Sequence, residues 1–228
     1  MRAEIRCGLP FVYTSMFKVL FIKNITMKKL MSLLCLGSLC VFMACGTSSS
    51  NTDSVDSAQN INDSMLSDSN SMENNDTANA VSSTPVSEED AKWAVEAANG
   101  GMTEVEMGKL AQEKATSDRL KGFGAMMVAD HGKAGDKLKQ IAAAKNIVLP
   151  ANLSDAAQKD LESLSKKSGK DFDKAYINLM LDDHKDDIDK FKKGSDDLKD
   201  ADLKSFATET LPVLQMHLDS IKAISGKK

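Results

Sequence analysis

From Glu88 to the end of the chain, apolar residues recur at intervals of three and four, and this spacing constrains the fold more than any other feature. Such spacing places the apolar side chains on one face of an α-helix. No run in this part alternates apolar and polar residues as a half-buried strand does. The sequence therefore predicts an all-α domain.

Four long amphipathic helices and one short helix account for the pattern. The predicted long helices cover residues 87–116, 117–145, 171–193 and 201–225, and the short extra helix covers 154–167. Gly100 is expected to weaken the first helix, Gly169 to end the short one and Gly194 to end the third. Pro212 is expected to kink the fourth. Four long helices with short connections predict an antiparallel four-helix bundle.

A second segment, MKKLMSLLCLGSLCVFMACG at residues 27–46, has the pattern of a bacterial lipoprotein signal. Lys28 and Lys29 precede an uncharged, mostly apolar run over residues 30–44, which is too short to span a bilayer comfortably. Small residues flank Cys45, whose thiol would carry the lipid after cleavage. The segment predicts a lipid-anchored protein of the bacterial cell envelope.

These signals divide the chain into four parts. Residues 1–26 are interpreted as a mis-assigned segment upstream of a true start at Met27, with a long basic leader as the alternative. Residues 27–44 form the signal peptide, 45–87 the lipidated cysteine with a disordered tether, and 88–226 the bundle. The tether is assigned from its abundance of Ser, Asn, Asp and Thr and its lack of basic residues.

Charge and cysteine content exclude several functions. Residues 1–45 hold six of the 29 basic and one of the 33 acidic residues, so the rest of the chain has a net charge near −9. An acidic chain without a basic cluster argues against nucleic acid as a partner. All four cysteines lie at or before Cys45, so the bundle has no disulfide, thiolate metal site or cysteine nucleophile.

The three histidines of the chain, His131, His184 and His217, each lie on the apolar stripe of a different predicted helix. Their side chains should therefore point into the bundle. All three lie near the middle of their helices, within roughly 6 Å of one height. Glu104 lies near the middle of the first helix, so one layer could hold three imidazoles and one carboxylate.

Such a layer suits a copper, zinc or iron ion. Met127 and Met180 precede two of the histidines by one turn and are candidate auxiliary ligands that would favour copper. Asp130 and Asp183 are candidate hydrogen-bond partners of the ligating imidazoles. In the alternative interpretation, the histidines are hydrogen-bonded core residues and the methionines fill gaps in the core.

The sequence contains no motif that supports another kind of active site. A di-iron centre needs Glu-x-x-His motifs, but Val128, Leu181 and Leu214 stand three residues before the histidines. No nucleophile elbow, P-loop or dinucleotide-binding motif occurs in the sequence. The sequence therefore favours a protein without catalytic residues and leaves enzymatic activity undecided.

The second and third long helices resemble each other. Residues 121–138 align without gaps on residues 174–191, and the alignment places Asp130 and His131 on Asp183 and His184. An internal duplication and a shared packing constraint both explain the match.

Several segments resemble a known family: GGMTEVEMGKLAQEKA, MMVADH, LPANL, DFDKAYINLMLDDH and LPVLQMH. They resemble the bacterial envelope family described as domain of unknown function 4142, whose members are often labelled predicted outer membrane proteins. The resemblance covers residues 91–225. It implies a ferritin-like helical bundle and carries no established activity.

Two functions remain open. The first is a lipid-anchored envelope protein that binds a transition metal through its core histidines. The second is a non-catalytic structural or protein-interaction module without metal. In either case we expect a membrane partner through lipid on Cys45, envelope proteins as further partners and no nucleic acid. The expected location is the outer membrane, facing the periplasm or the cell surface.

Overall fold

The computed structural model describes residues 53–70 and 86–226, which contain helices and no strand. The described helices are α1 (Ser54–Asn70), α2 (Glu88–Lys114), α3 (Asp118–Ala144), α4 (Asp155–Ser165), α5 (Gly169–Asp197) and α6 (Ala201–Ser225). The predicted all-α class is confirmed.

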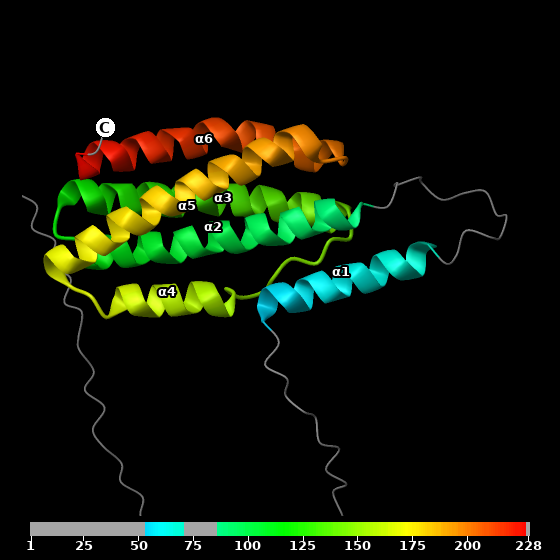
Figure 1. Cartoon of the computed structure of the whole chain (residues 1–228), viewed down its shortest axis with the longest axis horizontal. Coiled ribbons are helices and arrows are strands. Elements are labelled where there is room, and N and C mark those ends of the chain that lie inside the picture. The colour runs from blue at the N-terminus through cyan, green and yellow to red at the C-terminus, as the bar shows by residue number, and fades with distance from the viewer. Residues whose placement is uncertain (1–52, 71–85, 227–228) are drawn as a thin grey trace, which may run out of the picture. The chain divides into compact units, whose positions relative to one another are not determined.

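Helices α2, α3, α5 and α6 form a four-helix bundle. Helix α2 packs on α3, α5 packs on α6, and each pair contacts the other through α3 with α6 and α2 with α5. Neighbouring helices run in opposite directions, and α4 returns the chain along the bundle so that α3 and α5 run the same way (Figure 1). The predicted antiparallel bundle with a short extra helix is therefore confirmed.

Polar side chains fix where the bundle helices begin. The hydroxyl of Ser87 accepts a hydrogen bond from the backbone of α2, and Ser117 and Ser154 do the same for α3 and α4. The carboxylate of Asp200 accepts two backbone N–H groups of α6. Asp90 is 2% exposed and accepts the N–H groups of Lys199 and Asp200, which joins the start of α2 to the α5–α6 connection.

The interior contains two apolar clusters, one at each end of the bundle. The first includes Ala94, Leu138, Phe191, Leu203 and Phe206. The second includes Met107, Phe123, Met127, Phe172, Tyr176 and Ile221. Along α3, α5 and α6 the three histidines fall between residues of the first cluster and residues of the second. A polar layer therefore separates the two clusters.

Glycines behave differently from their predicted roles. Helix α2 continues through Gly100, and α5 continues past Gly194 to Asp197. A Cβ at Gly194 would lie 2.8 Å from Nε1 of Trp93, so this glycine makes room for the indole ring instead of ending the helix. The short helix ends at Ser165, and Gly169, with φ of +56°, is the first residue of α5. Helix α6 continues through Pro212.

The prediction of an entirely disordered tether is wrong for residues 54–70, which form α1. Hydrogen bonds from its side chains, and not an apolar core of its own, join α1 to the rest of the domain. The Asn62 amide donates to the carbonyl oxygen of Val148 and accepts from its N–H, at 2.9 and 2.7 Å. Asp53 accepts the N–H of Val55 at the start of the helix and the N–H of Asp155 at the start of α4.

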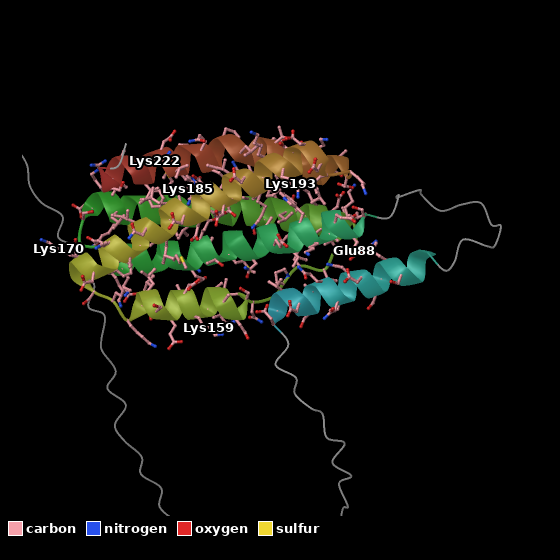
Figure 2. The ribbon with its side chains drawn as sticks, in the orientation of Figure 1. Glu88, Lys159, Lys170, Lys185, Lys193 and Lys222 are labelled. Atoms are coloured by element: carbon pink, nitrogen blue, oxygen red, sulfur yellow. The ribbon has the colours of Figure 1, made fainter. Side chains whose placement is uncertain are left out.

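Residues 1–52, 71–85 and 227–228 lie outside the described part of the chain. The mis-assigned upstream segment, the signal peptide, lipidation of Cys45 and the rest of the tether therefore stay predictions. Among the described helices, none is both long and apolar enough to cross a membrane. Their outer faces carry charged side chains such as Lys159, Lys185 and Lys193 (Figure 2).

Candidate metal centre

Each bundle helix contributes one side chain to the polar layer: Glu104 from α2, His131 from α3, His184 from α5 and His217 from α6. These four residues are at most 6% exposed. One ring nitrogen from each histidine lies within 4.8 Å of the corresponding nitrogens of the other two. The amphipathic patterns thus bring the three imidazoles together at the centre of the bundle.

Two of the imidazoles are oriented by a hydrogen bond on one ring nitrogen. Nδ1 of His184 lies 2.8 Å from the carbonyl oxygen of Met180, one turn earlier in α5. Nε2 of His217 lies 2.9 Å from a carboxylate oxygen of Asp130 on α3. Since a neutral imidazole carries one proton, donation at these atoms leaves the lone pair on the opposite nitrogen.

The opposite nitrogens are buried and accept no hydrogen bond. This holds for Nε2 of His184 and Nδ1 of His217, and Nε2 of His131 is likewise buried without a hydrogen-bond partner. A buried polar atom left in this state costs about 1–3 kcal/mol. Three such atoms grouped in one layer are therefore a large cost unless a ligand occupies the space between them.

The Glu104 carboxylate faces the same space. Its Oε2 lies 2.8 Å from Nδ1 of His131, and its Oε1 lies 3.4 Å from Nε2 of His184. Neither oxygen takes part in a hydrogen bond of acceptable geometry. The carboxylate thus approaches two imidazoles from different helices without being satisfied by either.

Burial sets the protonation of the layer. It lowers the pKa of His131 and of His184 to about 4, and it also lowers the pKa of His217. Burial raises the pKa of Glu104 to about 7, and His184 partly opposes this shift. At neutral pH the imidazoles are neutral, which is the state that binds a metal ion.

The candidate auxiliary and hydrogen-bonding residues lie in different places. Met127 and Met180 are fully buried in the second apolar cluster, and Met180 contacts His184 through its carbonyl oxygen. Asp130 binds His217 on another helix. Among the described residues, no hydrogen bond joins Asp183 to a histidine. Burial, followed by the charge of Asp187, raises the pKa of Asp183 to about 7.

Sequence reasoning missed three residues around the layer. Phe123 packs its ring against His184 and His217, with centroids 6.2 and 6.5 Å away. The hydroxyl of Tyr176 is buried without a hydrogen-bond partner, and burial raises its pKa. Asp187 lies one turn after His184, and burial raises its pKa to about 7. That spacing was the signal that could have identified Asp187.

Comparison with solved structures supports the fold. The bundle resembles a crystal structure of a DUF305 fragment from Deinococcus radiodurans, with a TM-score of 0.56 and 7% sequence identity. The match covers 62% of this chain and 98% of the other. At this identity the likeness concerns the fold alone. No curated protein matches the sequence.

The family assignment comes from the sequence of the domain. Residues 75–224 match the family described as Domain of unknown function (DUF4142), which confirms the resemblance noted above. The match includes α2 to α5, nearly all of α6, and all four residues of the polar layer. The chain therefore belongs to the DUF4142 family.

Proposed function

We propose that this protein binds one transition-metal ion in the cell envelope, with His131, His184 and His217 as ligands and Glu104 as the fourth. Two observations carry the proposal: one ring nitrogen of each histidine lies within 4.8 Å of those of the other two, and each imidazole has one buried nitrogen without a hydrogen-bond partner. Each imidazole comes from a different helix, so a bound ion would link three helices of the bundle.

The alternative is a structural or interaction module without metal. In that case the histidines should satisfy their hydrogen bonds within the protein, because unsatisfied buried polar atoms are destabilising. Two histidines do so on their outer nitrogens only. The inner nitrogens and both Glu104 oxygens have no such partner, and a cation would interact favourably with all of them. The geometry therefore favours metal binding.

The ligand set narrows the choice of metal. Three imidazoles and one carboxylate are borderline ligands that suit zinc, copper or iron. Tetrahedral zinc fits four ligands from four helices, with ligand distances near 2.0–2.2 Å after a small contraction of the layer. The methionines belong to the apolar cluster, so the chain gives copper no additional preference in this proposal.

Elemental analysis tests the proposal. The full chain should be produced with its leader, extracted from membranes and purified without an affinity tag. We expect close to one equivalent of zinc, copper or iron. We expect less than a tenth of an equivalent in His184→Ala, and an unchanged content in Asp189→Ala, a surface change on the same helix.

Helical content by circular dichroism must accompany the analysis, so that loss of metal is separated from loss of fold. A folded His184→Ala variant that retains one equivalent would contradict the proposed ligand. Wild-type protein that remains metal-free after incubation with Zn²⁺, Cu²⁺ and Fe²⁺ would favour the structural or interaction module.

We further propose that lipid on Cys45 anchors the protein in the outer membrane. The support is the leader pattern over residues 27–46. Metabolic labelling with a radioactive fatty acid should label the wild type and Cys40→Ser but not Cys45→Ser. Label that persists in Cys45→Ser would overturn the anchor, and separation of inner and outer membranes would locate the labelled protein.

A further inference from the structure

A cavity of about 1130 Å³ connects the polar layer with the outside of the bundle. Its outer part is lined by Ser54 and Ser57 of α1, by residues 149–153 and by α4. Its inner end is lined by Glu104 and His131. The cavity therefore reaches the candidate centre from the side where α2 and α3 meet.

The charged side chains of the cavity are mostly acidic. Lys139 is the lysine in the lining, whereas three acids line it: Glu106, Asp136 and Asp155. Glu104 and Asp187 also line the cavity, and with pKa values of about 7 they are partly ionised at neutral pH. A concave surface lined by one sign of charge concentrates ions of the opposite sign. The cavity therefore favours a cation and disfavours an anion.

Three glycines lie in the wall of the cavity: Gly101, Gly132 and Gly135. A Cβ built at any of them would meet nothing within 4 Å, so no packing contact requires a glycine there. The residue of α5 that aligns with Gly135 is Ile188, which packs against both apolar clusters. Helix α3 thus leaves open a volume that α5 fills with a side chain.

Glu104 supplies an independent indication of what enters. It is 2% exposed, it lies at the inner end of the cavity, and neither of its oxygens has a hydrogen-bond partner. Nδ1 of His131 lies 2.8 Å from Oε2 of Glu104, and Nε2 of the same ring is buried without a hydrogen-bond partner. An entering cation would find two unsatisfied ligand atoms at the end of the cavity.

We infer that this acidic cavity is the route by which a hydrated divalent cation reaches the histidine centre, and that Gly135 keeps the route open. The inference rests on the proposed metal centre and adds the path and the class of ion that uses it. The ion would meet Glu104 and His131 first. His184 and His217 lie behind them, outside the cavity lining.

Gly135→Leu would close the route. A side chain on a helix leans over the preceding turn, so a leucine at 135 would cover the position of His131. The change also replaces glycine by a strong helix former, which favours folding. Gly122→Leu is the matched control, because Gly122 lies on the same helix, a Cβ there also meets nothing within 4 Å, and it does not line the cavity.

The experiment measures the rate at which metal-free full-length protein takes Zn²⁺ from a coloured chelator in stopped flow. We expect Gly135→Leu to take up Zn²⁺ at least tenfold more slowly than the wild type and Gly122→Leu at the wild-type rate. All three should reach the same final stoichiometry, since the ligands are unchanged. If circular dichroism shows that Gly135→Leu is unfolded, Gly101→Leu narrows the same cavity from α2.

Each outcome decides between the two proposals. Equal uptake rates in Gly135→Leu and Gly122→Leu would overturn the route and leave the metal centre standing. Absence of Zn²⁺ uptake by the wild type, together with absence of Cu²⁺ and Fe²⁺ uptake, would overturn the centre and the route with it.

Discussion

Helices α3 and α5 carry the same Met-x-x-Asp-His pattern but use it differently. In α3, Asp130 binds His217 of the neighbouring α6, and His131 faces Glu104. In α5, the ring of His184 is held by a carbonyl oxygen of its own helix. Burial, and after it the neighbouring carboxylates, raises the pKa of Asp183. The local pattern places a side chain on a face, but the neighbouring helix decides its partner.

Helices α3 and α5 also differ in the size of the side chain at an aligned position. Gly124 of α3 aligns with Ile177 of α5, and it is in close contact with α2. A Cβ at Gly124 would lie 2.7 Å from the carbonyl oxygen of Gly108 and 2.9 Å from Cβ of Ala111. Helix α3 therefore approaches the α2 backbone directly. Neither Gly108 nor Gly124 can take a side chain unless the two helices move apart.

Giving α3 the residue of α5 at this contact should have the largest effect. Gly124→Ile forces α2 and α3 apart, and we expect it to lower the free energy of unfolding by at least about 3 kcal/mol. Urea unfolding followed by circular dichroism measures the change. Gly122→Ala is the control and should be neutral or stabilising, because its Cβ has open space. A loss below about 1 kcal/mol in Gly124→Ile would contradict the close contact.

The two aspartates provide the next test of the comparison. Asp130→Ala removes the hydrogen-bond partner of His217 and should weaken Zn²⁺ binding by about 10–100-fold. Asp183→Ala removes no hydrogen bond to a ligand and should leave the affinity within about threefold of the wild type. Competition with a chelator of known affinity measures both. Equal losses of Zn²⁺ affinity in the two variants would mean that Asp130 and Asp183 have the same role.

Glu104 connects the two helices, because its oxygens approach His131 of α3 and His184 of α5. Its pKa of about 7 makes Zn²⁺ binding compete with a proton below neutral pH. We expect affinity to fall by up to about tenfold per pH unit from pH 7 to pH 5.5 and to level off above pH 7. The pKa values of His131 and His184, at about 4, add no competition in this range.

Glu104→Gln should remove this dependence. The variant should bind more weakly at pH 8 and show nearly constant affinity from pH 5.5 to pH 8. Calorimetric titrations in buffers of different ionisation enthalpy would also detect release of the Glu104 proton by the wild type near pH 6.5. A wild-type affinity that is independent of pH would exclude Glu104 as a ligand.

Much of the fold could be predicted from the sequence because it depends on local patterns. Apolar spacing determined the helices and the inward direction of the histidines. Gly194 misled the prediction, since its role depends on Trp93 from a helix about a hundred residues earlier. Helix α1 was missed because it is held by backbone hydrogen bonds to Asn62 instead of an apolar face.

In the candidate site, too, the features that depend on local sequence could be predicted and those that depend on neighbouring helices could not. One histidine on each of three stripes predicts convergence, because inward-facing residues at similar heights must meet. The partner of Asp130 and the isolation of Asp183 depend on which helices lie beside α3 and α5, and this information is absent from either segment alone. The spacing of Asp187 from His184 could have placed it near the layer, but its burial depends on the helices packed against α5.

Asp187 gives the smallest expected effect and a last contrast between the helices, because α3 has Ala134 at the aligned position. Burial raises the pKa of Asp187 to about 7 from 3.8. The folded protein therefore holds this proton over a range where the unfolded chain has lost it. The resulting loss of stability grows as pH rises from about 4 to 7 and is complete above pH 7.

Asp187→Asn removes this penalty in metal-free protein. We expect the variant to match the wild type near pH 4.5 and to exceed it by about 1–2 kcal/mol at pH 8 in urea unfolding. The gain stays moderate because the Asp187 side chain is 13% exposed, so water partly solvates its charge. The attraction of Lys190, 3.6 Å away, is already part of the pKa of about 7. Asp189→Asn, on the exposed face of α5, should show no such difference between the two pH values. If Asp187→Asn is less stable than the wild type at pH 8, the ion pair with Lys190 outweighs the burial of Asp187. In that case α5 holds the charged Asp187 without loss of stability at the position where α3 has Ala134.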